Sequence, residues 1–120
     1  MTLRTSLAIL ALVLGLPLSA GAFECPGEDR SLQSVKGTQS LAISTTSVGL
    51  TVPTQSTAMA RITVEDQPIR YWPSGTPTAS VGHLATAGTV LTACQADLAT
   101  IRFIRQGGTD ANLSITYYGP

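Results

Sequence analysis

The sequence is poor in charged residues, which make up 12% of its 120 residues. Seven residues are basic and seven are acidic, and Lys36 is the only lysine. Nucleic acids and anionic lipid surfaces are bound by clusters of lysine and arginine, and the arginines of this chain are scattered. We therefore expect neither a nucleic acid nor a membrane surface as a partner.

Residues that often carry catalysis or hold metals are also scarce. His83 is the only histidine, and Cys25 and Cys94 are the only cysteines. A histidine without a local motif that supplies a nucleophile and an orienting acid does not predict a catalytic triad. Two distant cysteines and one histidine do not match the ligand spacing of a typical zinc site.

Two further patterns give no support to catalysis. Glu65 and Asp66 are adjacent, so in a strand their carboxylates would point to opposite faces and could not work as an acid–base pair. Gly107-Gly108 is not followed by the lysine of a phosphate loop, and it indicates a hairpin instead. We expect a protein that is not an enzyme and that holds no cofactor or metal.

The sequence lacks an apolar run of roughly 20 residues, the length that spans a bilayer. The apolar run Leu7–Leu14 is short, and it lies between Arg4 and the small residues of Ala20–Ala22. A charged start, an apolar segment and a small-residue site in this order are typical of a secretory signal peptide. We therefore predict export, with cleavage before Phe23.

Cleavage would leave about 98 residues, a suitable length for one domain. We predict a signal peptide over 1–22, an N-terminal arm or irregular strand over 23–39, and a single domain over 40–120. Loss of Arg4 leaves six basic against seven acidic residues, so the mature protein would be close to neutral.

Both cysteines fall in the mature chain. In an oxidising compartment an even pair indicates one disulfide, here between Cys25 and Cys94. Two unrelated buried thiols are the alternative. A disulfide would tie the N-terminal arm to the second half of the domain, and the chain-entropy model gives it a stabilisation of about 4 kcal/mol as an upper value.

The mature sequence is rich in Ser, Thr, Val and Ile, a composition that favours strands over helices. The clearest strand is predicted over Ala58–Glu65, where apolar and polar residues alternate with a period of two. One face of it is expected to be buried, and it carries Ala58, Ala60, Ile62 and Val64. The other face is expected to be wet, and it carries Met59, Arg61, Thr63 and Glu65.

Similar but shorter patterns predict the rest of the fold. Strands are expected on both sides of a break at 44–47, and further along at 69–71, 81–84, 89–91, 101–105 and 111–118. The last of these places Leu113, Ile115 and Tyr117 on its buried face. The segment 93–100 could form a helical turn begun by Asp97. Together they predict an all-β fold, a small antiparallel β-sandwich or barrel of about six to seven strands.

One segment is predicted as a contact surface. Arg70, Tyr71 and Trp72 stand at the start of a Pro- and Gly-containing loop that runs to Ala79. Trp, Tyr and Arg are the residues that most often anchor protein interfaces. The same loop could equally fold over one end of the core, and the sequence leaves both interpretations open. Asn112 begins a glycosylation sequon, but it lies within a predicted strand.

The block from about Ala58 to Tyr118 resembles small β-sandwich proteins of tailed phages and prophages. The residues that carry the resemblance are Ala60–Glu65, Pro68–Tyr71, Gly75–Gly82, Ala87–Gly88, Asp97–Ile104 and Ala111–Tyr118. The resemblance implies a virion structural or accessory protein, with a protein partner or self-assembly. The alternative, which fits the predicted signal peptide, is an exported bacterial β-sandwich that binds a glycan or a protein at the cell surface.

Overall fold

The computed structural model describes Cys25 and residues 34–54 and 56–120. The predicted signal peptide and most of the predicted arm therefore lie outside the described residues. Eight strands and one short helix follow in the order β1 (Ser34–Ile43), β2 (Val48–Gly49), β3 (Met59–Val64), β4 (Ile69–Trp72), β5 (His83–Ala85), β6 (Val90–Cys94), α1 (Asp97–Thr100), β7 (Arg102–Arg105) and β8 (Ala111–Gly119).

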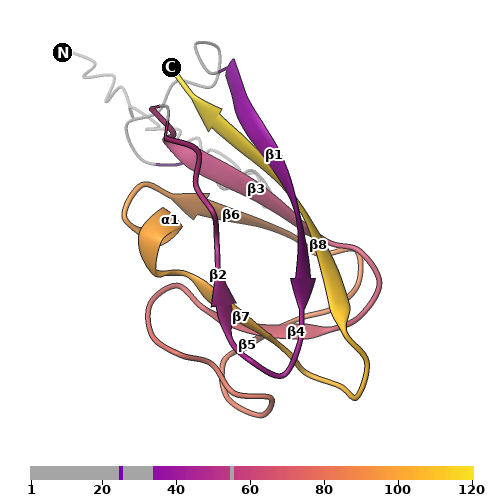
Figure 1. Ribbon diagram of the computed structural model, residues 1–120. Coiled ribbons are helices and arrows are strands. Elements are labelled where there is room, and N and C mark those ends of the chain that lie inside the picture. Colours follow the sequence, from indigo (N-terminus) through magenta and orange to yellow (C-terminus); the bar gives the residue numbers. More distant parts are fainter. Residues whose placement is uncertain (1–24, 26–33, 55) are drawn as a thin grey trace, which may run out of the picture.

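The strands form two four-stranded antiparallel sheets that pack face to face (Figure 1). Sheet A has the order β1-β8-β3-β6, and sheet B has the order β2-β7-β4-β5. The predicted all-β sandwich is confirmed, and the separate sheets rule out the barrel for the described residues. The described residues form eight strands against the expected six to seven, and the two shortest, β2 and β5, have two and three residues.

The core lies between the sheets and is built by alternation. In β3, Ala60, Ile62 and Val64 are fully buried, as the pattern predicted, whereas Arg61 is exposed. Sheet B contributes Phe103 and other apolar residues to the same layer. The predicted inward face of the last strand is also confirmed, since Leu113, Ile115 and Tyr117 are all buried.

One residue of β3 departs from the prediction. Met59 belongs to the face expected to be wet, yet it is buried. It lies in register with Cys94, whose disulfide partner Cys25 is itself buried. The disulfide therefore brings Cys25 over this end of the outer face of sheet A, and a long-range covalent contact of this kind leaves no trace in local alternation.

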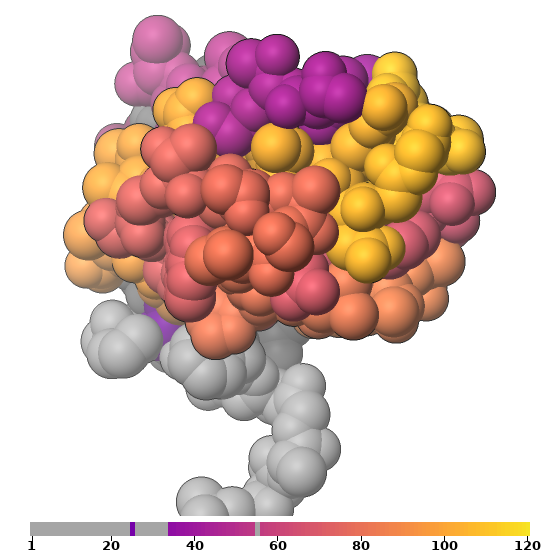
Figure 2. All heavy atoms as spheres, turned by 90° about the horizontal axis from the view of Figure 1, so that it is seen from below, coloured from indigo at the N-terminus to yellow at the C-terminus, as the bar shows by residue number. Residues whose placement is uncertain are grey.

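The connections between sheets were only partly predicted. The loop 106–110 was predicted as a hairpin, but β7 pairs with β4 in sheet B while β8 pairs with β1 and β3 in sheet A. That loop therefore crosses between sheets. The turn chemistry of Gly107-Gly108 indicates where the chain reverses, but it does not say whether the two flanking strands pair. Figure 2 shows the molecule from below, with the yellow C-terminal residues beside the salmon and orange residues that precede them in the chain.

Two boundaries also differ from those predicted. Strand β1 begins at Ser34, so the last six residues of the segment 23–39 belong to sheet A rather than to an arm. The helical turn is confirmed as α1, and Asp97 is its first residue, but residues 93–94 belong to β6 instead. The capping position is held by Ala96, which offers no side-chain hydrogen bond.

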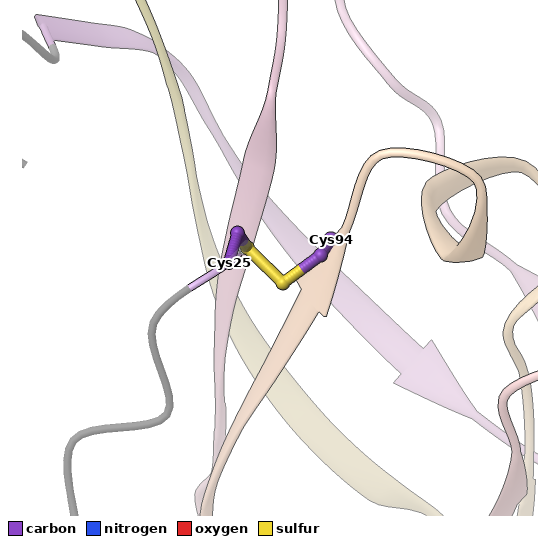
Figure 3. Close-up of a disulfide and its surroundings, with 2 residues drawn as sticks. All are labelled: Cys25 and Cys94. Carbon is purple, nitrogen blue, oxygen red and sulfur yellow. A yellow bond between two sulfur atoms is a disulfide. The ribbon is translucent and has the colours of Figure 1, made fainter. Parts of the chain in front are cut away.

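The two cysteines are joined in the structure, as Figure 3 shows. Cys94 ends β6, and Cys25 lies 69 residues earlier in the chain. Their Cα atoms are 5.4 Å apart, within the usual range for a disulfide. The bridge therefore fastens the start of the described chain to an edge strand of sheet A.

Candidate functional site

The segment predicted as a contact surface lies on strand β4, which is a central strand of sheet B. Trp72, expected to open a loop, is instead the last residue of this strand. Alternation splits the three residues between two faces. Tyr71 lies in register with the fully buried Phe103 and packs against the core, whereas Arg70 and Trp72 point to the outer face of the sheet.

Neighbouring strands add further side chains to that outer face. Arg70 lies in register with Leu84 on one side and Ile104 on the other, and Trp72 lies in register with Arg102. Leu84 is 50% exposed, and the other four are half-buried. We refer to these five residues, Arg70, Trp72, Leu84, Arg102 and Ile104, as the sheet B face. It combines one tryptophan, two arginines and two aliphatic side chains and contains no acidic residue.

Neutral groups hold both guanidinium groups of the sheet B face in place. Arg70 Nη1 donates to the carbonyl of Gly82 at 2.9 Å. Arg102 Nε donates to Ser47 Oγ at 3.2 Å, and its Nη2 donates to the Ser47 carbonyl at 2.9 Å. No carboxylate of the described residues pairs with either arginine. Both positive charges are therefore oriented but not neutralised, and an approaching anionic group could pair with them.

Arg70 also carries an unsatisfied donor. Its Nε is buried and has no hydrogen-bond partner among the described residues. Gly82, whose carbonyl accepts the hydrogen bond from Arg70 Nη1, has a φ of +130°. A Cβ atom at this position would lie 3.1 Å from the Tyr71 carbonyl oxygen. Only glycine therefore lets the backbone at position 82 come so close to β4. The hydrogen bond from Arg70 to the Gly82 carbonyl depends on this close approach.

His83 belongs to the same region. Its ring centroid lies 5.0 Å from that of Trp72, in an edge-on arrangement, and 5.3 Å from that of Tyr71. These distances are typical of aromatic pairs. The sequence assigned His83 no chemistry and did not link it to Trp72. The two residues are eleven apart, and only the return of the chain through β5 brings them together.

The loop between β4 and β5 is pinned at both ends. Thr100 Oγ1 donates to the Pro73 carbonyl at 2.7 Å, which ties the loop to α1. Thr78 and Val81 form a two-residue bridge, with N–H···O distances of 2.9 and 3.2 Å. Val81 is 52% exposed beside β5. Most of this loop is exposed, whereas the buried Pro77 covers part of the core.

Glu65 and Asp66 lie in the turn between β3 and β4. Glu65 is exposed, as expected for a solvated strand end. Asp66 is exposed too, but its carboxylate accepts hydrogen bonds from the backbone N–H and the side-chain Nδ2 of Asn112, both at 2.9 Å. These bonds lower the pKa of Asp66 below its usual value. Asp66 thus fixes the start of β8, and it engages the amide nitrogen that a glycan on the Asn112 sequon would need.

This contact makes stability depend on pH. Because folding lowers the pKa of Asp66, the carboxylate stabilises the fold above its unfolded pKa of about 3.9, and the effect is lost as the pH falls through the lower folded value. We expect Asp66→Ala to be less stable than the wild type at pH 7, and the difference to shrink below about pH 4. Urea unfolding across this pH range measures it. Glu65→Ala is the matched control, and an equal loss in both variants would contradict the role of Asp66.

Within residues 25, 34–54 and 56–120, no group of three or more His, Cys, Asp or Glu side chains is placed to hold a metal ion. In the same part of the chain, no helix has the length and apolarity to cross a membrane. No family model, curated protein or solved structure matches the chain.

Proposed function

We propose that this protein is a non-catalytic interaction module that binds a partner protein through the sheet B face. The observation that carries the proposal is the register of β5, β4 and β7, which gathers Trp72, two unpaired arginines and two aliphatic residues on one side of the sheet. Tryptophan and arginine dominate the binding energy of protein interfaces, and aliphatic neighbours exclude water around them.

The setting that the resemblance suggests is a phage particle, in which the module would be a structural or accessory part. The exported bacterial β-sandwich is the second candidate, and a specific observation favours it. A disulfide such as Cys25–Cys94 persists in an oxidising compartment and is rare in a reducing cytoplasm. Recovery of the protein from purified particles, or from the periplasm or cell surface, separates the two settings.

Truncation of the anchors tests the contact surface itself. We expect Trp72→Ala to weaken retention on the particle or cell surface by about 2 kcal/mol or more, roughly a thirtyfold loss of affinity, because it removes the largest apolar group of the sheet B face. Arg70→Ala should weaken retention as well, and the loss should decrease with added salt. Retention is measured by co-sedimentation with the purified particles or envelopes.

Matched controls lie on the opposite sheet. Arg61 is an exposed arginine on the outer face of sheet A, and Tyr118 is a half-buried aromatic on the same face. Arg61→Ala and Tyr118→Ala should leave retention unchanged. His83 is not an independent control, because it contacts Trp72. A folded Trp72→Ala protein that is retained like the wild type would reject the sheet B face.

A further inference from the structure

The longest strand of the protein lies at the edge of sheet A. Strand β1 pairs with β8 along one side, from Ser34 opposite Gly119 to Ile43 opposite Ala111. Among the described residues, no backbone group is hydrogen-bonded to its other side. The nearest such contact comes after the strand ends, where the Ser44 carbonyl accepts the Arg105 N–H at 3.1 Å. A row of backbone donors and acceptors therefore faces outwards along β1.

Edge strands usually carry features that prevent pairing with another chain, such as lysine, proline or a bulge. In β1 these features are confined to the first residues, where Lys36 stands and the register shifts between Val35 and Gly37. From Thr38 to Ile43 the strand is regular and has neither charge nor proline. The other edges are shorter, since β6 has five residues, β5 three and β2 two.

We propose that the segment Gly37–Ile43 pairs antiparallel with the same segment of a second copy of the chain, which joins the two A sheets into one continuous eight-stranded sheet. The proposal concerns the opposite sheet from the sheet B face and does not depend on it. In a pairing centred on Ser40, Gly37 would lie opposite Ile43 of the second copy, and Thr38 opposite Ala42.

The alternation of β1 suits this self-pairing. The even-numbered residues of this segment lie on the outer face of sheet A, and Thr38, Ser40 and Ala42 are all exposed. The odd-numbered residues face the core, where Leu41 and Ile43 pack. A pairing centred on Ser40 places even-numbered residues opposite even-numbered ones and odd-numbered opposite odd-numbered ones. The core-facing side chains of both copies therefore lie on one face of the joined sheet, and the hydroxyl groups lie on the other face.

The charge pattern favours a second copy over an unrelated strand. Lys36 is the only charged residue of β1, and the pairing places it opposite Ser44, so the lysines of the two copies lie at opposite ends of the joint. In such a dimer the two paired strands are the same segment related by a two-fold axis. They therefore have equal lengths, and no separate partner sequence is needed. Strand addition of this kind obtains its affinity from backbone hydrogen bonds.

Sedimentation equilibrium of the purified protein, with the Cys25–Cys94 disulfide intact, tests the proposal between micromolar and near-millimolar concentrations. The wild type should shift from monomer to dimer. Ser40→Lys should weaken the dimer at least tenfold, because it places two ammonium groups side by side at the two-fold axis. Ser114→Lys is the matched control. Ser114 is also exposed and lies in register with Ser40, but one strand further from the edge, so this variant should dimerise like the wild type.

A wild type that stays monomeric over the whole range would overturn the proposal, as would a dimer that both lysine variants weaken equally. Hydrogen exchange of the wild type gives a second measurement that needs no variant. Outward-facing amides of residues 38–43 should exchange more slowly at the high concentration than at the low one. Equal exchange rates would reject the β1 joint even if dimers form elsewhere.

Discussion

Ile62→Ala should lower the free energy of unfolding by about 2–5 kcal/mol, the range for an isoleucine cut back to alanine in a protein core. Ile62 has no exposed surface and lies in register with Leu91 on one side and Ile115 on the other. Removal of three carbon atoms at this position leaves a cavity in the core between the two sheets. Urea unfolding of the purified variant measures the loss.

Thr63→Ala is the control from the same strand. Thr63 is half-buried on the outer face of sheet A, in register with Val90 and Ser114. Its truncation should change stability by no more than about 0.5 kcal/mol, because the hydroxyl and methyl groups lie at the solvent side. Losses of the same size at Ile62 and Thr63 would show that both faces of β3 are covered, against the structure.

Removal of the disulfide is the second large effect that we expect. The bridge closes a loop between residues 69 positions apart, and the chain-entropy model gives about 4 kcal/mol for this length as an upper value. The double variant Cys25→Ser with Cys94→Ser should therefore unfold at a clearly lower urea concentration. Both cysteines are replaced together so that no free thiol remains to react.

Reduction provides the matched measurement for the disulfide. A reductant should destabilise the wild type by about the same amount as the double substitution does, and it should leave the double variant unchanged. Thiol labelling of the native, unreduced protein should find no free cysteine. Two reactive thiols in that experiment, or a reductant that changes nothing, would contradict the bridge.

The strands that face both the core and the solvent could be predicted from the sequence. β8 alternates along its whole length and β3 does so from Ala60 onwards, because sheet A is buried on one side and solvated on the other. The inward positions of Ile62, Val64 and Tyr117 therefore follow from a period of two. The short strands of sheet B were also expected near their observed positions, but their patterns did not show which of them pair. Their pairing is set by long-range contacts rather than by local pattern.

The sheet B face was likewise predicted only in part from the sequence. The residue types of Arg70 and Trp72 marked them as interface anchors in the sequence. Their three companions on the sheet B face could not be found there, because Leu84, Arg102 and Ile104 come from two other strands and reach the face only through register. Likewise, the burial of Met59 and the contact of His83 with Trp72 depend on parts of the chain that fold back from a distance.

The order of strands in sheet A has a consequence for how the protein reaches its native state. β8 is the last of the described strands, yet it lies between β1 and β3, and the Ser34 hydroxyl donates to the Gly119 carbonyl across 85 residues. Sheet A therefore cannot be completed until residues 111–119 have been synthesised. Such non-local pairing makes folding slow, on the order of milliseconds to seconds. For a chain that is exported as proposed, this delay keeps the polypeptide unfolded and able to thread through a translocation channel.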